Sequence, residues 1–447
     1  MRRAFRSWQQ DPLLRGVIRN SSYLFSSTSI TALLSLLQGI FAARLLGDES
    51  FGVLATIIVF VSSIHRLLSF RMNELMVKYL AESKDRQAAA IVKAAGLTEA
   101  LTSLLAFLVL VLLAPWAAQH LAKDPSTAPL FIFYGLVLFA NLTYETALGV
   151  LQGGGLFSRQ AQINLIQGIL TAGLILLAYV LKWGMAQVLL AYLLGKVFAG
   201  LGTTWLALRG CNRILGKGWW RVPLKTVGNW SELRHFAIST NLHGTANLVF
   251  RDSELLFISF LRSPVESGYF RIAQGVINLV MLPIEPFIAP TYAEISRTIA
   301  QKEWSASRRL LKRVSILAAA WTLPVAGFLA LFGYWLIPFL YGAEYRPAYP
   351  AMLILLAGYG FASIFHWNRP LLLALGMPSF PLRVSTITGL VKTLLTLFLL
   401  PLFGYLIEAA ILSGYFLASI GVNVWRGLRE VDTRMKSPSQ VEIAHKA

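Results

Sequence analysis

Long apolar segments, separated by short polar or basic ones, make up most of the chain. A helix that crosses a bilayer needs about 20 mostly apolar residues. The segments that meet this requirement are 22–46, 51–70, 94–118, 128–150, 162–181, 186–208, 235–260, 269–292, 314–340, 348–373, 380–402 and 404–425. The pattern therefore predicts an all-α polytopic membrane protein with about 12 transmembrane helices.

The composition narrows the class of protein further. Of the 447 residues, 56% are apolar and 14% are charged, whereas a soluble domain carries about 25% charged residues. This excludes a soluble globular enzyme, a disordered chain and a disulfide scaffold. The single Cys211 excludes internal disulfides, and the six histidines show no HExxH or comparable metal spacing. We therefore expect no metal, no cofactor and no enzymatic activity.

The charge balance points to membrane topology. The chain has 40 Lys and Arg against 21 Asp and Glu, a net charge of +19. In a soluble protein this excess would suggest nucleic acid, but membrane proteins concentrate Lys and Arg in their cytoplasmic loops. With the N-terminus inside, the predicted inner segments carry 29 basic residues and the outer loops 5. We therefore predict that both termini are cytoplasmic and that there is no nucleic-acid partner.

Short sequence matches repeat at an offset of about half the chain. "ESFG" (49–52) and "ESG" (266–268) both fall at the outer turn between the first two spans of a half. "LQGGG" (151–155) and "LALGMP" (373–378) both mark the inner turn before the fifth span of a half. Two six-span halves that both start inside form a parallel repeat. We therefore predict two pseudo-symmetric six-helix lobes around a central cavity, as in transporters that work by alternating access.

These boundaries predict the domain organisation. The first 21 residues carry five Arg along their whole length, and the apolar run that follows is long enough to span, so they are not a secretory signal. The predicted parts are a cytoplasmic amphipathic tail (1–21), an N-lobe (22–208), a basic cytoplasmic linker (209–234), a C-lobe (235–425) and a cytoplasmic C-tail (426–447).

Ionisable side chains inside the spans are the candidates for chemistry, because placing them in lipid costs free energy. The basic ones are Arg44, Arg66, Lys196, Arg251, Arg369 and Lys392, and the acids that we single out are Glu145, Asp252, Glu254, Glu285 and Glu408. By position, Lys196, Arg251 and Lys392 lie nearest the midplane, while Arg66 and Arg369 lie toward the inner side.

Several of these residues have competing interpretations. Lys196 and Lys392 have no acid one turn away in their own spans, so each needs a partner on another helix, water or an anionic substrate. We favour a position facing a cavity. Arg251 and Glu254 share a helical face, which leaves open a structural ion pair or a ligand role. Asp252 points about 100° away from Arg251, and either pairs with a neighbouring span or binds a coupling cation.

The remaining candidates lie near the ends of spans. Arg44 and Glu408 lie toward outer ends, where side chains reach the interface, so Arg44 is interpreted either as an anchor of the first span or as functional. Glu285 lies in "LPIEPFIAP", whose prolines predict a kink in the eighth span. It is either a proton site or a satisfied acid at the inner end.

The charges of the spans bear on the substrate. Basic groups near the midplane favour an anion, because Arg and Lys suit phosphate and pyrophosphate. An exporter of organic cations should instead have acids dominating the midplane. Since the candidates are mixed, charge alone leans only modestly toward an anionic substrate.

An ordered set of segments resembles the polysaccharide-biosynthesis flippases, the O-antigen and exopolysaccharide exporters of the multidrug/oligosaccharidyl-lipid/polysaccharide (MOP) superfamily. The segments are "AARLLGDESFG" (42–52) with Arg44, Gly47 and Gly52, "VLQGGGLFSRQAQINLIQGIL" (150–170), "DSELLFISFLRSPVESGYFRIAQGVI" (252–277), "LFGYWLIPFLYGAEYRPA" (331–348) and "LPLFGYLIEAA" (400–410). They cover nearly the whole chain. One departure is Glu408, where a small residue is expected before the two alanines that follow.

The resemblance implies a two-lobed, MATE-like flippase of the bacterial inner membrane. Its implied substrate is an oligosaccharide on a polyprenyl pyrophosphate carrier, moved to the outer leaflet for surface polysaccharide assembly. It implies that basic side chains in the cavity bind the pyrophosphate. The residues to which this role is assigned are Arg66, Lys196, Arg251, Lys392 and, more weakly, Arg369. Implied partners are the lipid bilayer, a polysaccharide polymerase and the chain-length machinery. Coupling to H+, to Na+ or to neither stays open.

Three alternatives remain beside the flippase. A cation-coupled multidrug exporter shares the lobed plan, but the 42–52 turn and the mid-span lysines argue against it. A membrane glycosyltransferase or polymerase commonly has a large loop or domain, whereas the longest loops here are about 25 residues and basic. A non-transporting scaffold for polysaccharide assembly is disfavoured because idle charges in the membrane cost free energy.

Overall fold

A computed structural model describes residues 12–436, apart from 70–71, 83–84, 229, 232–233, 235–237, 239–240, 242–244, 246–247 and 251. At a few further positions inside helices it describes the backbone alone. All regular elements of the described residues are α-helices or short 3-10 helices, in accordance with the predicted all-α fold. The seventh expected span, 235–260, falls in large part outside the described residues.

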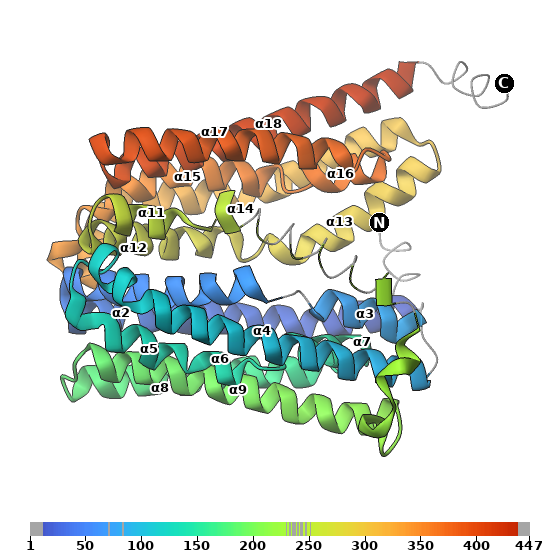
Figure 1. The fold of residues 1–447 in the computed structure, drawn as a ribbon. Coiled ribbons are helices and arrows are strands. Elements are labelled where there is room, and N and C mark those ends of the chain that lie inside the picture. The colour runs from blue at the N-terminus through green and yellow to red at the C-terminus, as the bar shows by residue number, and fades with distance from the viewer. Residues whose placement is uncertain are drawn as a thin grey trace. The chain divides into compact units, whose positions relative to one another are not determined.

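The chain divides into two compact units, Met1–Val265 and Glu266–Ala447 (Figure 1). Unit 1 contains α2 (Pro12–Leu68), α3 (Met72–Glu82), α4 (Asp85–His120), η1 (Pro125–Thr127), α5 (Ala128–Gly135), α6 (Val137–Ala140), α7 (Tyr144–Gly153), α8 (Phe157–Val180), α9 (Met185–Ile214), η2 (Trp219–Arg221), η3 (Leu224–Val227) and α11 (Glu254–Leu261). The unit boundary falls later in the chain than the linker at 209–234, and the lobe boundaries stay a prediction.

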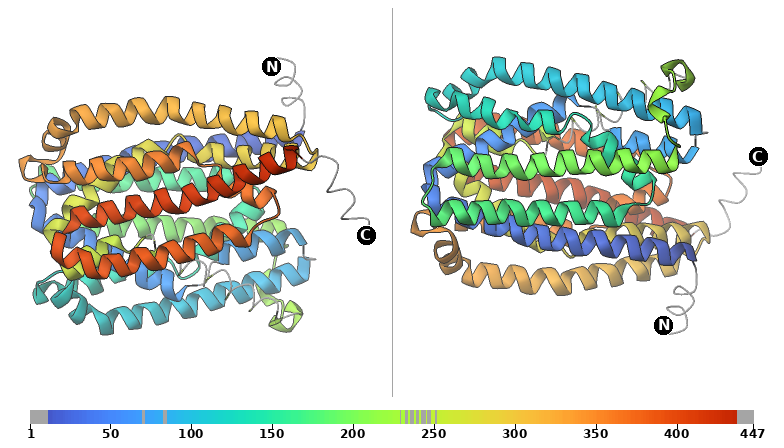
Figure 2. Two further views of the ribbon diagram at one scale, coloured as in Figure 1. Left: turned by 90° about the horizontal axis from the view of Figure 1, so that it is seen from above. Right: turned by 90° about the horizontal axis from the view of Figure 1, so that it is seen from below.

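Unit 2 begins within α12 (Pro264–Met281). Its other elements are α13 (Glu285–Ala300), α14 (Trp304–Tyr341), η4 (Ala343–Tyr345), α15 (Ala348–Ile364), α16 (Asn368–Ala374), α17 (Ser379–Phe403) and α18 (Tyr405–Lys436). The long helices α14, α15, α17 and α18 lie beside one another, with α18 packed on α15 and α17 (Figure 2). Gly404 separates α17 from α18 with a φ of 74°, a conformation that glycine adopts without steric cost.

Nine helical segments of the described residues are long and apolar enough to cross a membrane. One of them, Ser29–Leu68, covers most of both the first and the second expected span. Large apolar side chains on these helices are exposed within the protein, for example Leu112 at 79% and Phe339 at 74%. In water this exposure would be costly, whereas lipid tails are as apolar as the side chains. The chain is therefore a multi-pass membrane protein.

The predicted turn between the first two spans is a sharp bend in α2. Gly47 has φ 73° and ψ 175°, which breaks the helix between the two spans. Gly52 lies where the chain approaches another segment closely, because a Cβ built on it would come within 1.8 Å of the carbonyl oxygen of Pro264. These two glycines of the resembling motif thus have separate physical roles, one in the bend and one in backbone packing.

Several expected spans are discontinuous. The prolines of "LPIEP" separate α12 from α13, which confirms the predicted kink in the eighth span. The fourth expected span is broken before Tyr144 at the start of α7, and the tenth before Asn368 at the start of α16. The sequence pattern did not predict either break. These two helix starts lie 224 residues apart, close to the offset of the short sequence repeats.

Candidate functional site

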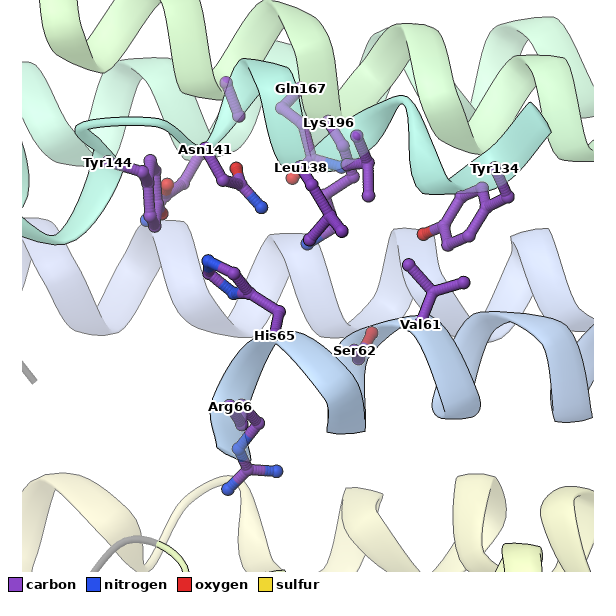
Figure 3. A pocket seen from close by; sticks show the side chains of 13 residues that line it. Val61, Ser62, His65, Arg66, Tyr134, Leu138, Asn141, Tyr144, Gln167 and Lys196 are labelled. Carbon is purple, nitrogen blue, oxygen red and sulfur yellow. The ribbon is translucent and has the colours of Figure 1, made fainter. Parts of the chain in front are cut away.

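A cavity of about 210 Å³ lies inside unit 1 (Figure 3). Its lining comes from α2, from the broken span formed by α5, α6 and α7, and from α8 and α9. The lining residues are Val61, Ser62, His65, Arg66, Tyr134, Val137, Leu138, Asn141, Tyr144, Asn164, Gln167, Lys196 and Ala199. Asn141 lies at the break between α6 and α7, so the helix discontinuity itself forms part of the wall.

Close helix packing places Lys196 in this wall. On α9, the neighbouring Gly195 lies so close to α8 that a Cβ would come within 1.9 Å of the Thr171 hydroxyl oxygen. One turn further along, Gly200 approaches the carbonyl oxygen of Ala140 on α6, and a Cβ there would come within 2.2 Å of it. Small residues that let helix backbones approach closely are typical of membrane helix packing. They hold α9 against both neighbours, with Lys196 directed between them.

The cavity is cationic. Lys196 and Arg66 line it, and its thirteen lining residues include no carboxylate. The Lys196 ammonium group makes no ion pair with any residue in the described part of the chain. Lys196 therefore lines a cavity, and its role in binding substrate stays a prediction. Because an ammonium group in a span is costly without a partner, the arrangement suits an anion that enters the cavity.

Arg66 and Asp252 form an ion pair. The guanidinium Nη2 of Arg66 donates to Oδ2 of Asp252 at 2.7 Å, and the two side chains are 52% and 36% exposed. Of the two interpretations of Asp252, the pairing with another span is the one that the structure shows. The pair is solvent-accessible, so its net contribution to stability is small. Both groups are therefore accessible to an incoming ligand.

Lys392 occupies a different environment from the one expected. Its ammonium nitrogen lies 3.6 Å from Oε1 of Glu408, and the two side chains are 1% and 0% exposed. The Thr396 hydroxyl donates to the other carboxylate oxygen at 2.8 Å. Lys392 thus packs between α17 and α18 in unit 2 and does not face a cavity in this conformation. Glu408, which has no place in the family pattern, is its counter-ion.

The other expected residues are placed as follows. Arg369 is exposed and makes no ion pair within the described part of the chain, while Glu254 is buried. Arg44 is exposed near the bend of α2. Arg251, and the side chain of Glu285, lie outside the described residues. No group of three or more His, Cys, Asp or Glu among the residues searched could hold a metal ion.

Sequence reasoning missed Glu99, which positions one wall of the cavity. Its carboxylate is fully buried on α4 and accepts hydrogen bonds from the backbone N–H groups of Glu145 at 2.7 Å and Thr146 at 2.9 Å. These groups belong to the first turn of α7, where unsatisfied donors and the helix dipole favour an anion. Tyr144, in the same turn, lines the cavity. The sequence did contain a signal for this residue, because Glu99 is an acid within the third expected span, 94–118.

Sequence reasoning also missed the uncharged polar lining. His65 lies in the wall opposite Asn141 and Tyr144, and its Nε2 is buried without a hydrogen-bond partner in the described structure (Figure 3). Gln167 and Asn164 contribute amides from α8. Amides and imidazoles both donate and accept hydrogen bonds. Each stands in an otherwise apolar span, but the sequence does not reveal that they face one another.

The fold and the site define a class before any family is considered. Discontinuous membrane helices around a polar, cationic cavity are features of transport proteins, which place their substrate sites at such breaks. The chain belongs to the polysaccharide biosynthesis protein family, whose sequence profile matches residues 17–296. The resemblance of the sequence to these exporters is thereby confirmed.

Comparison with individual proteins agrees with this family. The inner membrane protein YghQ of Escherichia coli (strain K12) is 23% identical over 353 residues, which cover 76% of this chain and 97% of that protein. Lipid II flippase MurJ, in an inward closed conformation, is similar in fold with a TM-score of 0.71 and 14% identity, covering 91% of this chain and 89% of that one. An inward-facing multidrug resistance MATE family transporter of the MOP superfamily has a TM-score of 0.67 and 15% identity, covering 92% and 96%.

Proposed function

We propose that this protein is a flippase for a polyprenyl-pyrophosphate-linked oligosaccharide. It moves the lipid-linked unit from the cytoplasmic to the outer leaflet by alternating access, and the unit then serves the assembly of a surface polysaccharide. Membership of the polysaccharide biosynthesis family and the MOP-type fold support this function. The observation that carries the proposal is the cavity, whose lining has no carboxylate and in which Lys196 has no counter-ion among the described residues.

The diphosphate is the part of the substrate that this cavity suits. An ammonium group binds phosphate oxygens through charge-assisted hydrogen bonds, which are stronger than neutral ones. A cationic drug would instead meet two positive side chains, of which only Arg66 has an acidic partner, Asp252, within the described part of the chain. A volume of about 210 Å³ is below the roughly 300–1,000 Å³ of most ligand pockets. It therefore holds the head region, with the remaining sugars and the prenyl chain outside it.

Arg66 supplies a second contact that changes when substrate binds. In this structure its guanidinium group is paired with Asp252. A diphosphate beside Lys196 competes with Asp252 for the same donors, because Arg recognises phosphate and carboxylate through the same planar fork. The exchange gives up the Arg66–Asp252 pair, but this costs little free energy because both side chains are accessible to solvent.

The proposal includes the membrane setting. We place the protein in the bacterial inner membrane with both termini in the cytoplasm, because the basic residues concentrate on the predicted inner segments. Translocation makes and breaks no covalent bond, so no catalytic residue is required. A polysaccharide polymerase and its chain-length machinery are the proposed downstream partners. Whether a gradient of H+ or Na+ drives translocation is measured by imposing each gradient in the proteoliposome assay described below.

The test is translocation in proteoliposomes that contain the purified protein. A polyprenyl-pyrophosphate oligosaccharide is supplied in one leaflet, and its arrival in the other is followed by accessibility to a sugar-modifying enzyme. Lys196→Met should slow translocation about 10- to 100-fold, because a hydrogen bond to a charged group contributes about 1.5–3 kcal/mol. Lys196→Arg should retain most of the activity.

The matched control is Lys312→Met. It removes an exposed lysine of α14 that lies outside the cavity, and it should translocate as the wild type does. Equal rates in Lys196→Met and the wild type would refute the cavity assignment. Failure to move any of several oligosaccharides, together with gradient-driven efflux of a cationic dye, would replace the flippase by a multidrug exporter.

A further inference from the structure

The last turns of α9 and the segment that follows them carry regularly spaced basic residues. Between 209 and 228 the chain contains five basic residues and no acid. The five occur at every fourth position, and we call their side chains the basic loop surface: Arg209, Arg213, Lys217, Arg221 and Lys225. All five are exposed, and none makes an ion pair within the described part of the chain. Their charges are therefore not consumed by the protein itself.

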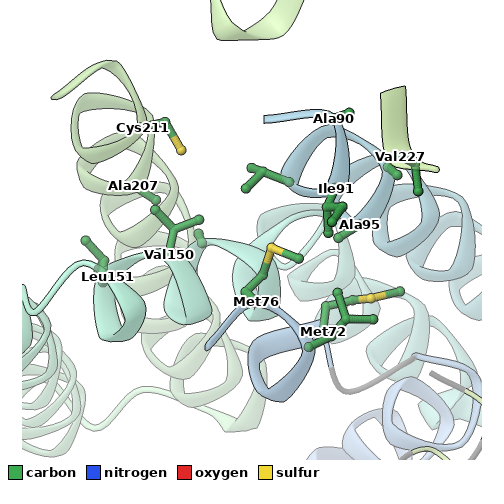
Figure 4. Close-up of a cluster of buried hydrophobic side chains, with 14 residues drawn as sticks. Met72, Met76, Ala90, Ile91, Ala95, Val150, Leu151, Ala207, Cys211 and Val227 are labelled. Carbon is green, nitrogen blue, oxygen red and sulfur yellow. The ribbon is translucent and has the colours of Figure 1, made fainter. Parts of the chain in front are cut away.

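The loop is held in place by its apolar residues. Val227 is buried in a cluster of apolar side chains that includes Ile91 and other residues of α4 (Figure 4). Trp219, Val222 and Leu224 are partly buried and pack against this cluster. Two side chains of α4 also donate to its backbone, Lys93 to the Val222 carbonyl oxygen at 3.4 Å and Gln87 to that of Val227 at 3.1 Å. These contacts anchor the loop to unit 1 along its length.

The side chains of the anchored loop lie on two faces. Val222, Leu224 and Val227 point into the cluster, whereas Arg221 and Lys225 stand exposed on the other side. Trp220 is 51% exposed and accompanies them. On a charged face in water an exposed tryptophan has no stabilising role. At a membrane interface it is favourable, because the indole ring has an apolar body and a polar N–H.

The adjoining helices place this face at the level of the membrane surface. The loop leaves the end of the candidate span Met185–Ile214 and packs on the beginning of the candidate span Arg86–His120. Near the end of α9, the guanidinium group of Arg209, the first residue of the basic loop surface, stacks on the exposed ring of Trp205, 3.6 Å from its centroid. A stacked pair of arginine and tryptophan suits the boundary between lipid tails and head groups.

We infer that the basic loop surface binds the head groups of anionic glycerophospholipids in the cytoplasmic leaflet. Lys and Arg near a bilayer attract anionic lipid through the phosphate charge, and Trp220 inserts beside the glycerol region. The exposed charges, which make no ion pair within the described part of the chain, favour binding of anionic lipid. Because the loop is attached to α4, this lipid site has a fixed position on the protein. The site lies apart from the cavity that carries the proposed transport function.

The test measures lipid contact at Trp220. The full-length protein is placed in nanodiscs of phosphatidylcholine that contain an equal mole fraction of brominated phosphatidylglycerol or brominated phosphatidylcholine. Bromine quenches nearby indoles, and the difference between wild type and Trp220→Phe isolates the contribution of this one side chain. We expect the anionic quencher to be about two- to fivefold more effective, and the preference to weaken at high salt.

Two charge variants locate the cause of the preference. The triple variant K217Q/R221Q/K225Q should abolish it. The matched variant R309Q/K312Q/R313Q removes three exposed charges from α14 and should preserve it. Equal quenching by both lipids in the wild type would overturn the inference, as would an absence of quenching at Trp220 or loss of the preference in both triple variants. The salt arm uses the wild type alone, so the proposal stays testable if a variant fails to fold.

Discussion

The buried pair of Lys392 and Glu408 gives the sharpest energetic prediction. Their charged atoms lie 3.6 Å apart and both side chains are almost fully buried. At an effective dielectric constant of about 20, the Coulomb attraction at this distance is roughly 4–5 kcal/mol. Desolvation of both groups offsets much of it, so the pair as a whole is worth little, but removing one partner leaves a buried charge alone.

Single and double substitutions should therefore differ sharply. Lys392→Met and Glu408→Gln should each lower the free energy of unfolding by about 3–5 kcal/mol, while the double variant should lie within about 1 kcal/mol of the wild type. Gln in place of Glu408 still accepts the hydrogen bond from Thr396. The measurement is denaturation with sodium dodecyl sulfate in mixed micelles, followed by tryptophan fluorescence, on all four proteins.

The same variants decide between a structural and a substrate-binding lysine. If the ion pair is the role of Lys392, the double variant should translocate at close to the wild-type rate. Additive losses of less than about 1 kcal/mol for each single change would refute the energetic reasoning. If the double variant folds but does not translocate, Lys392 binds substrate in another conformation of unit 2.

Two further predictions concern the packing of unit 1. Glu99→Ala should lower the free energy of unfolding by about 1–3 kcal/mol, because two buried backbone donors lose their acceptor. Glu99→Gln should lose less, and an equal loss for both variants in the detergent titration would count against the capping role. Gly52→Ala should reduce the yield of folded protein on size-exclusion chromatography, because a Cβ there would overlap a carbonyl oxygen. Gly39→Ala is its control, since nothing lies within 4 Å of a Cβ at that position, and identical yields would refute the clash.

The broken spans show where sequence reasoning succeeded and where it stopped. The kink between α12 and α13 was predictable, because proline removes a backbone donor and clashes with the preceding turn. The break before Tyr144 has no such local cause. There the first turn of α7 depends on Glu99, a residue of a different helix, to satisfy its backbone N–H groups. When a residue of another helix stabilises a helix break, the sequence of the broken segment itself contains little sign of the break.

The candidate site divides in the same way. Lys196 was predictable as a residue in need of an anion, because no acid lies one turn away in its own span. The same reasoning was wrong for the position of Lys392, whose acid lies on the next helix. The two lysines look alike in sequence and differ in their surroundings, since among the described residues Lys392 meets a carboxylate across a helix interface and Lys196 meets none.

The sequence by itself determined that this chain is a membrane protein of many helices, and it predicted which ends lie inside. It also indicated the turn within α2 and the break between α12 and α13. These properties are local, because in lipid each spanning segment must satisfy its own backbone hydrogen bonds and needs only length, apolarity and suitable breakers to do so. The tertiary structure decided which charges meet. Arg66 reaches Asp252 across 186 residues of sequence, while Lys196 meets no acid among the residues that the structure describes. Those outcomes depend on how each helix is rotated and how closely its glycines let it approach a neighbour, and one helix alone does not encode them.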